Sequence, residues 1–385
     1  MYSLRGTMSQ DTFAKQNPLF QLMQDSGHSI EDLLPAFPGM SPSQVTQVLV
    51  DNRFGTRRSV ERFGYLGVRE CSSRYFNVDE NGRRLNGQGS SSNKTGYQIH
   101  CYGGSTTLGQ NVADNQTISS YLATQLRQVF NAEVTVSTYG AGNHTSLHSS
   151  LRLLDHALSG RAPNCAIFLN GFNDCFYAAG GADGIVPFLD DVLYKSQDSL
   201  LKESRLVDLI TNIPDTRNAL INFHIDEKVS DEQLLRNIKT RYLTSVAIQN
   251  FIEKYFNVKI LRFIEPTSFV HCKPEQYLLT NIGSGSNRLK MIAKLYKKIE
   301  KQGCAKTFGT KNLTSLLDSG QDSLKIPLYV DEVHFSPAFN AHIARQIVGQ
   351  LKFLGRVRVK KITDDISELR PDMADTVDNR NYPLF

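Results

Sequence analysis

One short part of the sequence combines a strand, a glycine turn and a helix, and it restricts the fold more than any other. Apolar and polar residues alternate over 97–101, which is typical of a strand, and the run ends at Gly103 and Gly104. Ser105 follows at once, and over 115–130 apolar residues recur at helical spacing. Open α/β sheets carry their chemistry on loops at the carboxyl ends of strands. This stretch therefore predicts an α/β fold with Ser105 at the functional edge of the sheet.

The succession of strand and helix continues along the chain. The run at 165–169 is apolar throughout, as expected of a central parallel strand that is buried on both faces. Leucines at 147, 151, 154 and 158 recur at helical spacing and predict the apolar seam of a helix. Further strands are predicted at 133–138 and 258–264, and further helices at 235–256, 289–299 and 339–351. The pattern favours a three-layer α/β/α architecture around a flavodoxin-like parallel sheet.

The regular pattern does not cover the whole chain, and it suggests a domain division. Residues 96–355 are predicted to form the α/β domain, preceded by a helical and irregular N-terminal extension over 1–95. Residues 178–255 interrupt the rhythm with mostly helical, polar sequence. They are predicted to be an insertion that either covers the strand ends as a lid or packs as a separate subdomain. The final 356–385 are predicted to be a polar tail.

Composition excludes several classes of function. The chain has 385 residues and a formal net charge of +5, with no stretch near the roughly 18 apolar residues that a membrane helix needs. The first residues lack the apolar run of a signal peptide, so the expectation is a cytoplasmic protein without a membrane span. The basic stretches lack interleaved aromatic residues, so nucleic-acid binding is not expected. Six scattered cysteines show no zinc-binding spacing and are expected to be free thiols. Nothing indicates an oligomeric state.

A second candidate for the site lies near the carboxyl end of the pattern. Ser336 is a suitable N-cap and Pro337 a suitable first residue for the last helix, so Asp331 and His334 must lie in the loop before it. A serine hydroxyl is a poor nucleophile at neutral pH and needs a base, which His334 would supply to Ser105. Asp331 would orient that base and stabilise its charged form.

Two more loops at the same edge offer donors for an oxyanion. One carries Gly142 and Asn143, and the other carries Asn173. The backbone N–H groups of Ser105 and of Gly142 or Asn143, with the Asn173 side-chain amide, would stabilise the charge that develops on an attacked carbonyl.

Taken together, four sequence blocks resemble the SGNH hydrolase superfamily, also called the GDSL esterase/lipase superfamily. They read G-G-S-T-T at 103–107, G-A-G-N-H-T-S at 140–146, G-F-N-D at 171–174 and D-E-V-H-F-S-P at 331–337. The resemblance implies that Ser105 is the nucleophile, His334 the base, Asp331 its partner and Asn173 the side-chain oxyanion donor. It implies neither a metal nor an organic cofactor.

The sequence departs from the family pattern in two places. Gly104 stands where an aspartate usually precedes the nucleophile. In the second block, at 140–146, the residue that donates its backbone N–H to the oxyanion is either Gly142 or Asn143, depending on the alignment. The resemblance implies an esterase that cleaves an acyl ester through an acyl-enzyme. A small acyl group such as an O-acetyl on a carbohydrate is favoured as the substrate. The alternatives are an acyltransferase on the same scaffold and a non-catalytic binding protein that retains the fold.

Overall fold

The computed structural model describes eleven stretches of the chain, which together contain the sheet and the predicted site. They are residues 29–55, 58–61, 63, 65–87, 96–129, 134–179, 230–271, 287–301, 309–313, 327–331 and 333–351. The predicted tail at 356–385 lies outside them, as do residues 1–28 of the predicted extension and 180–229 of the predicted insertion.

A five-stranded parallel sheet forms the centre of the molecule, in the order β4-β3-β5-β6-β7. Numbered along the sheet's own chain order this is 2-1-3-4-5, the flavodoxin-like arrangement, which confirms the predicted fold class. The two-residue β7 is an addition that the sequence pattern did not predict. The strands are β3 (Tyr97–Gly103), β4 (Val134–Thr138), β5 (Cys165–Asn170), β6 (Lys259–Ile264) and β7 (Lys311–Asn312).

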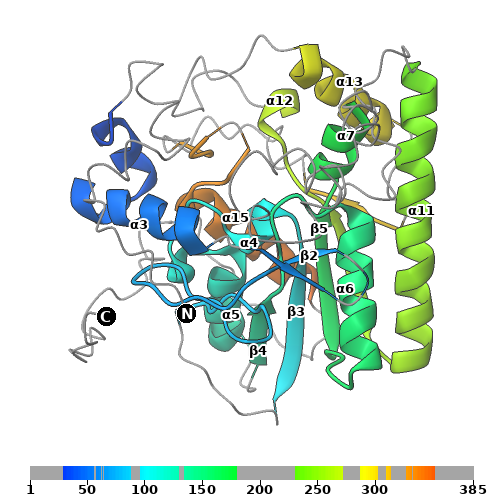
Figure 1. Cartoon of the computed structure of the whole chain (residues 1–385), viewed down its shortest axis with the longest axis horizontal. Coiled ribbons are helices and arrows are strands. Elements are labelled where there is room, and N and C mark those ends of the chain that lie inside the picture. Colours follow the sequence, from blue (N-terminus) through cyan, green and yellow to red (C-terminus); the bar gives the residue numbers. More distant parts are fainter. Residues whose placement is uncertain are drawn as a thin grey trace, which may run out of the picture.

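Helices cover both faces of this sheet and complete the three layers (Figure 1). On one face α5 packs with α15, and on the other α6 packs with α11, while α7 and α13 pack together near the carboxyl ends of the strands. The helices are α4 (Ser105–Leu108), η2 (Asp114–Gln116), α5 (Ile118–Val129), α6 (Ser146–Leu158), α7 (Phe172–Ala179), α11 (Asp231–Phe256), α12 (Ser268–His271), α13 (Asn287–Lys301) and α15 (Pro337–Gln350).

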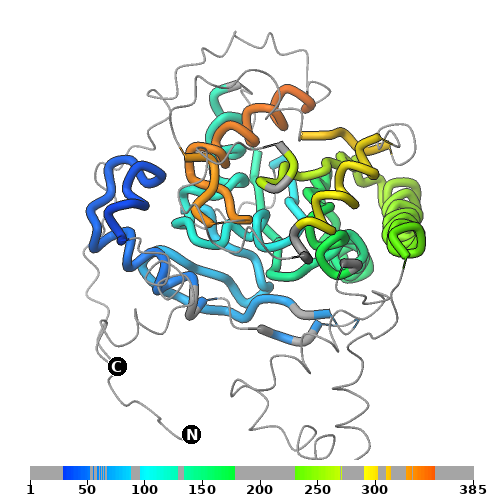
Figure 2. The backbone as a smooth tube through the Cα atoms, turned by 90° about the horizontal axis from the view of Figure 1, so that it is seen from above, coloured from blue at the N-terminus to red at the C-terminus, as the bar shows by residue number. Residues whose placement is uncertain are grey.

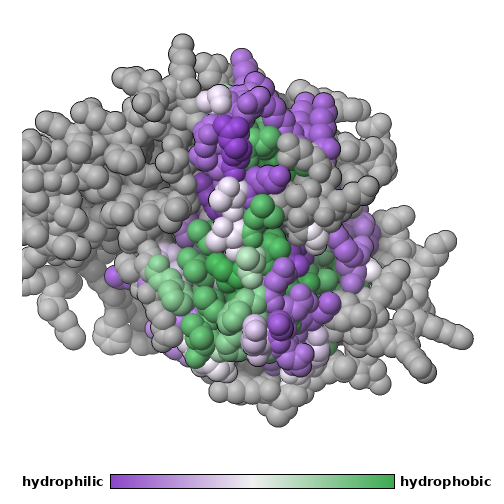
Figure 3. All heavy atoms as spheres, turned by 90° about the vertical axis from the view of Figure 1, so that its right-hand side faces the viewer, coloured by the Kyte–Doolittle hydropathy of each residue, from purple (hydrophilic) through white to green (hydrophobic). Residues whose placement is uncertain are grey.

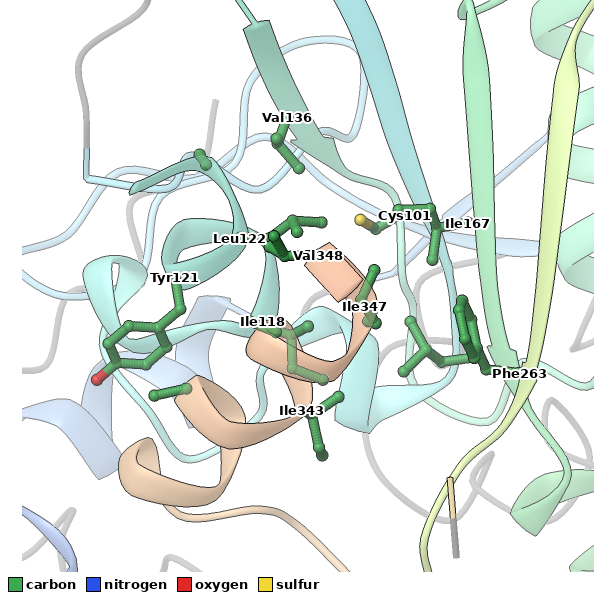
Figure 4. Close-up of a cluster of buried hydrophobic side chains, with 14 of the residues drawn as sticks. Cys101, Ile118, Tyr121, Leu122, Val136, Ile167, Phe263, Ile343, Ile347 and Val348 are labelled. Carbon is green, nitrogen blue, oxygen red and sulfur yellow. The ribbon is translucent and has the colours of Figure 1, made fainter. Parts of the chain in front are cut away.

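The main hydrophobic core lies between the sheet and the α5–α15 pair (Figure 4). Because side chains alternate along a strand, Cys101 of β3 and Ile167 of β5 point to this face. There they meet Leu122 of α5 and Ile347 of α15, all of them almost completely buried. The alternation read from the sequence at 97–101 is therefore the alternation between the two faces of the sheet.

Helix α6 differs from its prediction. Leu158 is 55% exposed and the leucines at 147, 151 and 154 are only half-buried, whereas Leu153 is fully buried. The buried side of α6 is mostly polar and includes Ser149 and His156. These groups hydrogen-bond inside the protein, as described below, so the helix does not need the leucine seam to face the core.

Residues 29–87 are packed against the α/β core rather than standing apart from it. They form η1 (Glu31–Ala36), α3 (Pro42–Gly55) and an antiparallel pair, β1 (Arg58–Val60) and β2 (Leu66–Val68). Figure 2 shows these blue segments along one side of the core. Arg84 of this segment also forms an antiparallel β-bridge with Thr138 of the edge strand β4.

Helix α11 forms the carboxyl part of the predicted insertion at 178–255. It packs on α6 and β6, and its first half also packs on α7, which follows the carboxyl end of β5. The role of 178–255 as an insertion stays a prediction. On the surface that carries α11, hydrophobic residues are visible (Figure 3), and Leu243 and Phe251 of this helix are 41% and 47% exposed. Among the described residues, no helix combines the length and the apolar character that a membrane crossing requires.

Candidate active site

Ser105 is the first residue of α4, directly after strand β3. The chain is crowded at the two preceding glycines, and only a residue without a Cβ fits there without a shift of its neighbours. A Cβ on Gly103 would lie 2.3 Å from the Leu169 carbonyl oxygen, and a Cβ on Gly104 would lie 2.5 Å from Asn173 Nδ2. A side chain at position 104 would therefore require the Asn173 amide to shift.

Asp331 and His334 lie in a tight loop that is closed at both ends. Val330 N donates to the His334 carbonyl oxygen over 2.8 Å, and Tyr329 pairs with Phe335. As predicted, Ser336 caps α15 by accepting from the Phe339 backbone N–H. Inside the loop Asp331 Oδ1 accepts from the backbone N–H groups of residues 333 and 334, over 2.8 and 2.7 Å. The D-x-x-H spacing thus turns the carboxylate towards the imidazole of the same loop.

The structure brings the three predicted residues into one hydrogen-bonded line. His334 Nδ1 lies 2.6 Å from Asp331 Oδ2, and His334 Nε2 lies 2.9 Å from Ser105 Oγ. With its proton on Nδ1, the ring donates to the carboxylate and leaves Nε2 to accept the serine hydroxyl. These distances meet the geometric requirements for a histidine and an aspartate that activate a serine.

The charge on Asp331 is favoured by its surroundings. Burial alone would raise the pKa of this carboxyl, but the adjacent His334 imidazole and the N–H donors of the loop outweigh it, so the pKa lies below the ordinary value. The side chains of Asp331 and His334 are 17% and 14% exposed. Ser105 is half-buried, so the line of residues is shielded from bulk water without being sealed.

The predicted oxyanion donors lie on the two neighbouring loops. Asn173 Nδ2 donates to the His144 carbonyl oxygen over 2.9 Å, which holds the amide beside Gly104. Gly142 and Asn143 lie together on the turn between β4 and α6, both half-buried, and Asn143 has a φ of 69°. The two remain alternative donors, since they share this turn.

Glu265 is a buried carboxyl at the same edge whose importance the sequence pattern did not show. It follows strand β6 and is 2% exposed. Thr106 Oγ1 donates to one carboxyl oxygen over 2.5 Å and the Phe172 N–H to the other over 3.1 Å. Burial raises the pKa of Glu265 to about 7, against the lowering effect of these two hydrogen bonds. Glu265 therefore joins the turn after Ser105 to the loop before Asn173. Its position directly after a predicted strand was the available signal.

Asp174 makes a similar connection between the second and third sequence blocks. Its carboxylate accepts from Ser146 Oγ over 2.7 Å and from the Ser146 backbone N–H over 3.1 Å. Burial raises the pKa of Asp174, while Arg241 and the Ser146 donors oppose the shift. The turn that carries Asn143 is thereby fixed against the helix that carries Asn173.

Side chains suited to bind a metal are not clustered in the described part of the chain, where no group of three or more His, Cys, Asp or Glu residues could hold an ion. The structure describes four cysteines, Cys71, Cys101, Cys165 and Cys175, and none of them is disulfide-bonded. The other two cysteines of the sequence, at 272 and 304, lie outside the described residues.

Comparisons with known proteins give matches among solved structures alone. No family model matches the sequence, and no curated protein matches it. An acetyl xylan esterase, AlAXEase, matches 66% of this chain and 99% of its own, with 13% identity and a TM-score of 0.38. A member of the lipolytic protein G-D-S-L family from Veillonella parvula matches 66% and 97%, with 10% identity and a TM-score of 0.36. The lipase/acylhydrolase from Enterococcus faecalis matches 69% and 99%, with 15% identity and a TM-score of 0.35. What the site can do chemically follows from its own geometry.

Proposed function

We propose that this chain is a serine ester hydrolase of the SGNH type. One observation carries the proposal. Ser105 Oγ lies 2.9 Å from His334 Nε2, and His334 Nδ1 lies 2.6 Å from Asp331 Oδ2, at the carboxyl edge of a parallel sheet. A serine that only caps a helix requires no hydrogen bond to a histidine. A histidine that only packs in a loop requires no carboxylate at Nδ1, the nitrogen opposite the serine. The joint geometry supports catalysis because it satisfies the requirements of nucleophile, base and orienting acid at once.

The first half of the reaction forms an acyl-enzyme. Ser105 Oγ attacks the ester carbonyl while His334 Nε2 takes its proton, and Asp331 stabilises the imidazolium that forms. His334 then returns the proton to the departing alcohol oxygen as the bond from carbonyl carbon to alcohol breaks. In the second half, water attacks the acyl-Ser105 ester with the same base, and Ser105 leaves with its proton restored.

The tetrahedral intermediates carry a negative oxygen that needs donors in place beforehand. The Ser105 N–H, the N–H of Gly142 or Asn143 and the Asn173 amide are the proposed donors. Loss of one such donor costs on the order of 3 kcal/mol of transition-state stabilisation. The hydrogen bond from Asn173 Nδ2 to the His144 carbonyl oxygen supports this role, because it keeps the amide from rotating away from Gly104 and Ser105.

The favoured substrate class is a small acyl ester, with an O-acetyl group on a carbohydrate as the leading candidate. It rests on the G-G-S-T-T form of the first block, and a glycan-linked ester is therefore the natural first substrate to assay.

Labelling of the purified full chain with a fluorophosphonate probe tests the proposal, with hydrolysis of p-nitrophenyl acetate and butyrate measured in parallel. The wild type should be labelled and should turn over, and Ser105→Ala should lose both. Ser159→Ala, at an exposed serine after α6, is the matched control and should behave as wild type. A folded wild-type protein that neither reacts with the probe nor hydrolyses either ester would contradict the proposal and favour a binding protein.

A further inference from the structure

The Asp331 carboxylate has a side-chain partner that lies far from it in the sequence. Asn111 Nδ2 donates to Asp331 Oδ2 over 2.7 Å, so the oxygen that meets the His334 imidazole also receives an amide N–H. The other oxygen accepts from the backbone N–H groups of Val333 and His334. Four donors thus fix both oxygens, and Asn111 is the one that comes from outside the 331–334 loop. Among the described residues, the remaining donors to this carboxylate all come from its own loop.

Asn111 lies on a turn after α4 that needs a special backbone conformation. Its φ is 67°, in the left-handed region that asparagine and glycine tolerate better than other residues. Asn52 of α3 fixes this turn with two hydrogen bonds, to the backbone of Asn111 and of Val112. Its Oδ1 accepts from the Asn111 backbone N–H over 3.0 Å, and its Nδ2 donates to the Val112 carbonyl oxygen over 3.0 Å. Asn52 is 1% exposed, so water does not compete for these bonds.

Arg84 holds the same turn from its other side. Its guanidinium donates to the carbonyl oxygens of Leu108, Gly109 and Val112, and to Asp114 Oδ1 over 2.9 Å. Arg84 is 1% exposed, and a buried guanidinium requires such acceptors to offset the loss of water. The turn that carries Asn111 is therefore determined by two residues of the N-terminal segment, Asn52 and Arg84.

Apolar packing binds the same parts together. Val112 and Val330, the neighbours of Asn111 and Asp331, are both fully buried in one cluster. The other members of that cluster come mostly from η1 and α3 and include Leu33, Val48 and Leu49. The two backbones that bear the contact between amide and carboxylate are thus held by one small core from residues 29–55.

We propose that Asn111 is a positioning residue that fixes the Asp331 carboxylate against His334, and that residues 29–87 hold Asn111 in place through Asn52 and Arg84. This inference rests on the proposed hydrolase function. It gives the N-terminal segment a task in the reaction, since a carboxylate that rotates away from the ring no longer orients the base.

Two substitutions at position 111 separate a positioning role from a role in the backbone turn. Asn111→Gly keeps the left-handed turn but removes the amide, and Asn111→Asp keeps size and conformation but replaces the N–H donor by a carboxylate that repels Asp331. Both should lower kcat for p-nitrophenyl acetate about tenfold to hundredfold with little change in KM, and Asn111→Asp should lose more. The same changes at Asn257, an exposed asparagine with a φ of 54° at the end of α11, are the matched controls and should leave kcat unchanged.

A double-mutant cycle with Asp331→Ala decides whether Asn111 acts through the carboxylate. In that background, Asn111→Gly should cause no further loss in kcat or in the rate of fluorophosphonate labelling. Wild-type kcat in both Asn111 variants would overturn the inference, and so would a loss that persists in full in the Asp331→Ala background, as misfolding would produce. A wild type without turnover or labelling would overturn the proposed function and this inference with it.

Asn52→Ala tests the link to the N-terminal segment. It should lower kcat by roughly threefold to tenfold, and this loss should vanish in the Asn111→Gly background, because Asn52 acts through Asn111. Additive losses would show that α3 does not act through this turn, and would overturn that part of the inference.

Discussion

The two faces of the central sheet are built from different chemistry. On the side of α5 and α15, hydrocarbon side chains such as Leu122 and Ile347 are fully buried. On the side of α6, the Tyr102 hydroxyl lies 3.1 Å from His100 Nδ1 and 2.7 Å from His156 Nδ1, all of them buried. Burial of hydrocarbon stabilises the fold with little demand on geometry, whereas a buried hydrogen bond adds little net stability but fixes directions. The first face is therefore mostly apolar, whereas the second adds directional hydrogen bonds to an apolar cluster of its own that includes Leu153, Phe168 and Ile252.

The polar side continues directly into the candidate site. Ser149 Oγ of α6 donates to Asn170 Oδ1 at the end of β5, over 3.0 Å. Arg152 donates to the carbonyl oxygens of Tyr139 and Gly82, over 3.0 and 2.9 Å. These bonds fix the strand ends and loops from which the proposed oxyanion donors project, so the hydrogen bonds of the polar side reach the candidate site.

The largest effect is expected on the apolar face. Ile347→Ala should reduce the free energy of unfolding by roughly 2–5 kcal/mol, because it leaves a cavity in a fully buried position. Urea denaturation measures this, and Ile347→Val, the control, should cost about 0.5–1.5 kcal/mol. The kcat of the molecules that remain folded should not change. A variant that keeps its stability but loses kcat would contradict the division between the two faces.

A smaller, pH-dependent effect is expected at Glu265. Its pKa is raised to about 7 when folded, above the ordinary value near 4.3, so the carboxyl stabilises the fold below about pH 4.3. That stabilisation is lost as the pH rises to 7. Glu265→Gln mimics the protonated acid and lacks this titration. Between pH 4.5 and 8 the wild type should therefore lose roughly 3 kcal/mol relative to the variant, measured by urea denaturation at both pH values. An equal pH dependence in the two proteins would show that Glu265 stays ionised throughout.

The smallest effect, of opposite sign, is expected at His100. Burial, with the positive charges of Arg83, Arg161 and Arg152, lowers the pKa of His100 to about 3. The unfolded chain binds a proton below about pH 6.5, where the folded protein does not, so stability falls as the pH falls from 6.5 towards 3. From pH 6.5 to 5 this amounts to about 2 kcal/mol. His100→Phe should abolish that part of the acid destabilisation in urea titrations. If its pH dependence matches the wild type, His100 is protonated in the folded protein.

The same contrast explains what the sequence could and could not predict. The alternation at 97–101 and the continuous apolar run at 165–169 predicted strands correctly, because hydrocarbon burial follows the geometry of the element. The leucines of α6 misled, because polar groups such as Ser149 and His156 find buried partners that periodicity does not show. The three-layer architecture could thus be predicted from one kind of residue, while the content of one of its layers could not.

For the candidate site, residue chemistry was the useful signal. Serine, aspartate and histidine at strand ends are few enough to be compared, and the structure brings Ser105, Asp331 and His334 together; their catalytic roles stay predictions. Asn111 and Glu265 were missed because their roles depend on hydrogen bonds to Asp331 and Thr106, which lie 220 and 159 positions away in the sequence. No local pattern marks such a contact, and one structure is enough to show it.

The burial of Val330 beside Leu33 and Val48 has a consequence for how the protein is made. Ribosomes add about 5–20 residues per second, so α3 emerges on the order of tens of seconds before the residue that completes its core. Until then the nascent chain exposes an apolar surface that chaperones recognise. Asp331 and His334 are synthesised next to Val330, so the hydrogen-bonded line with Ser105 is also completed long after α3 has emerged.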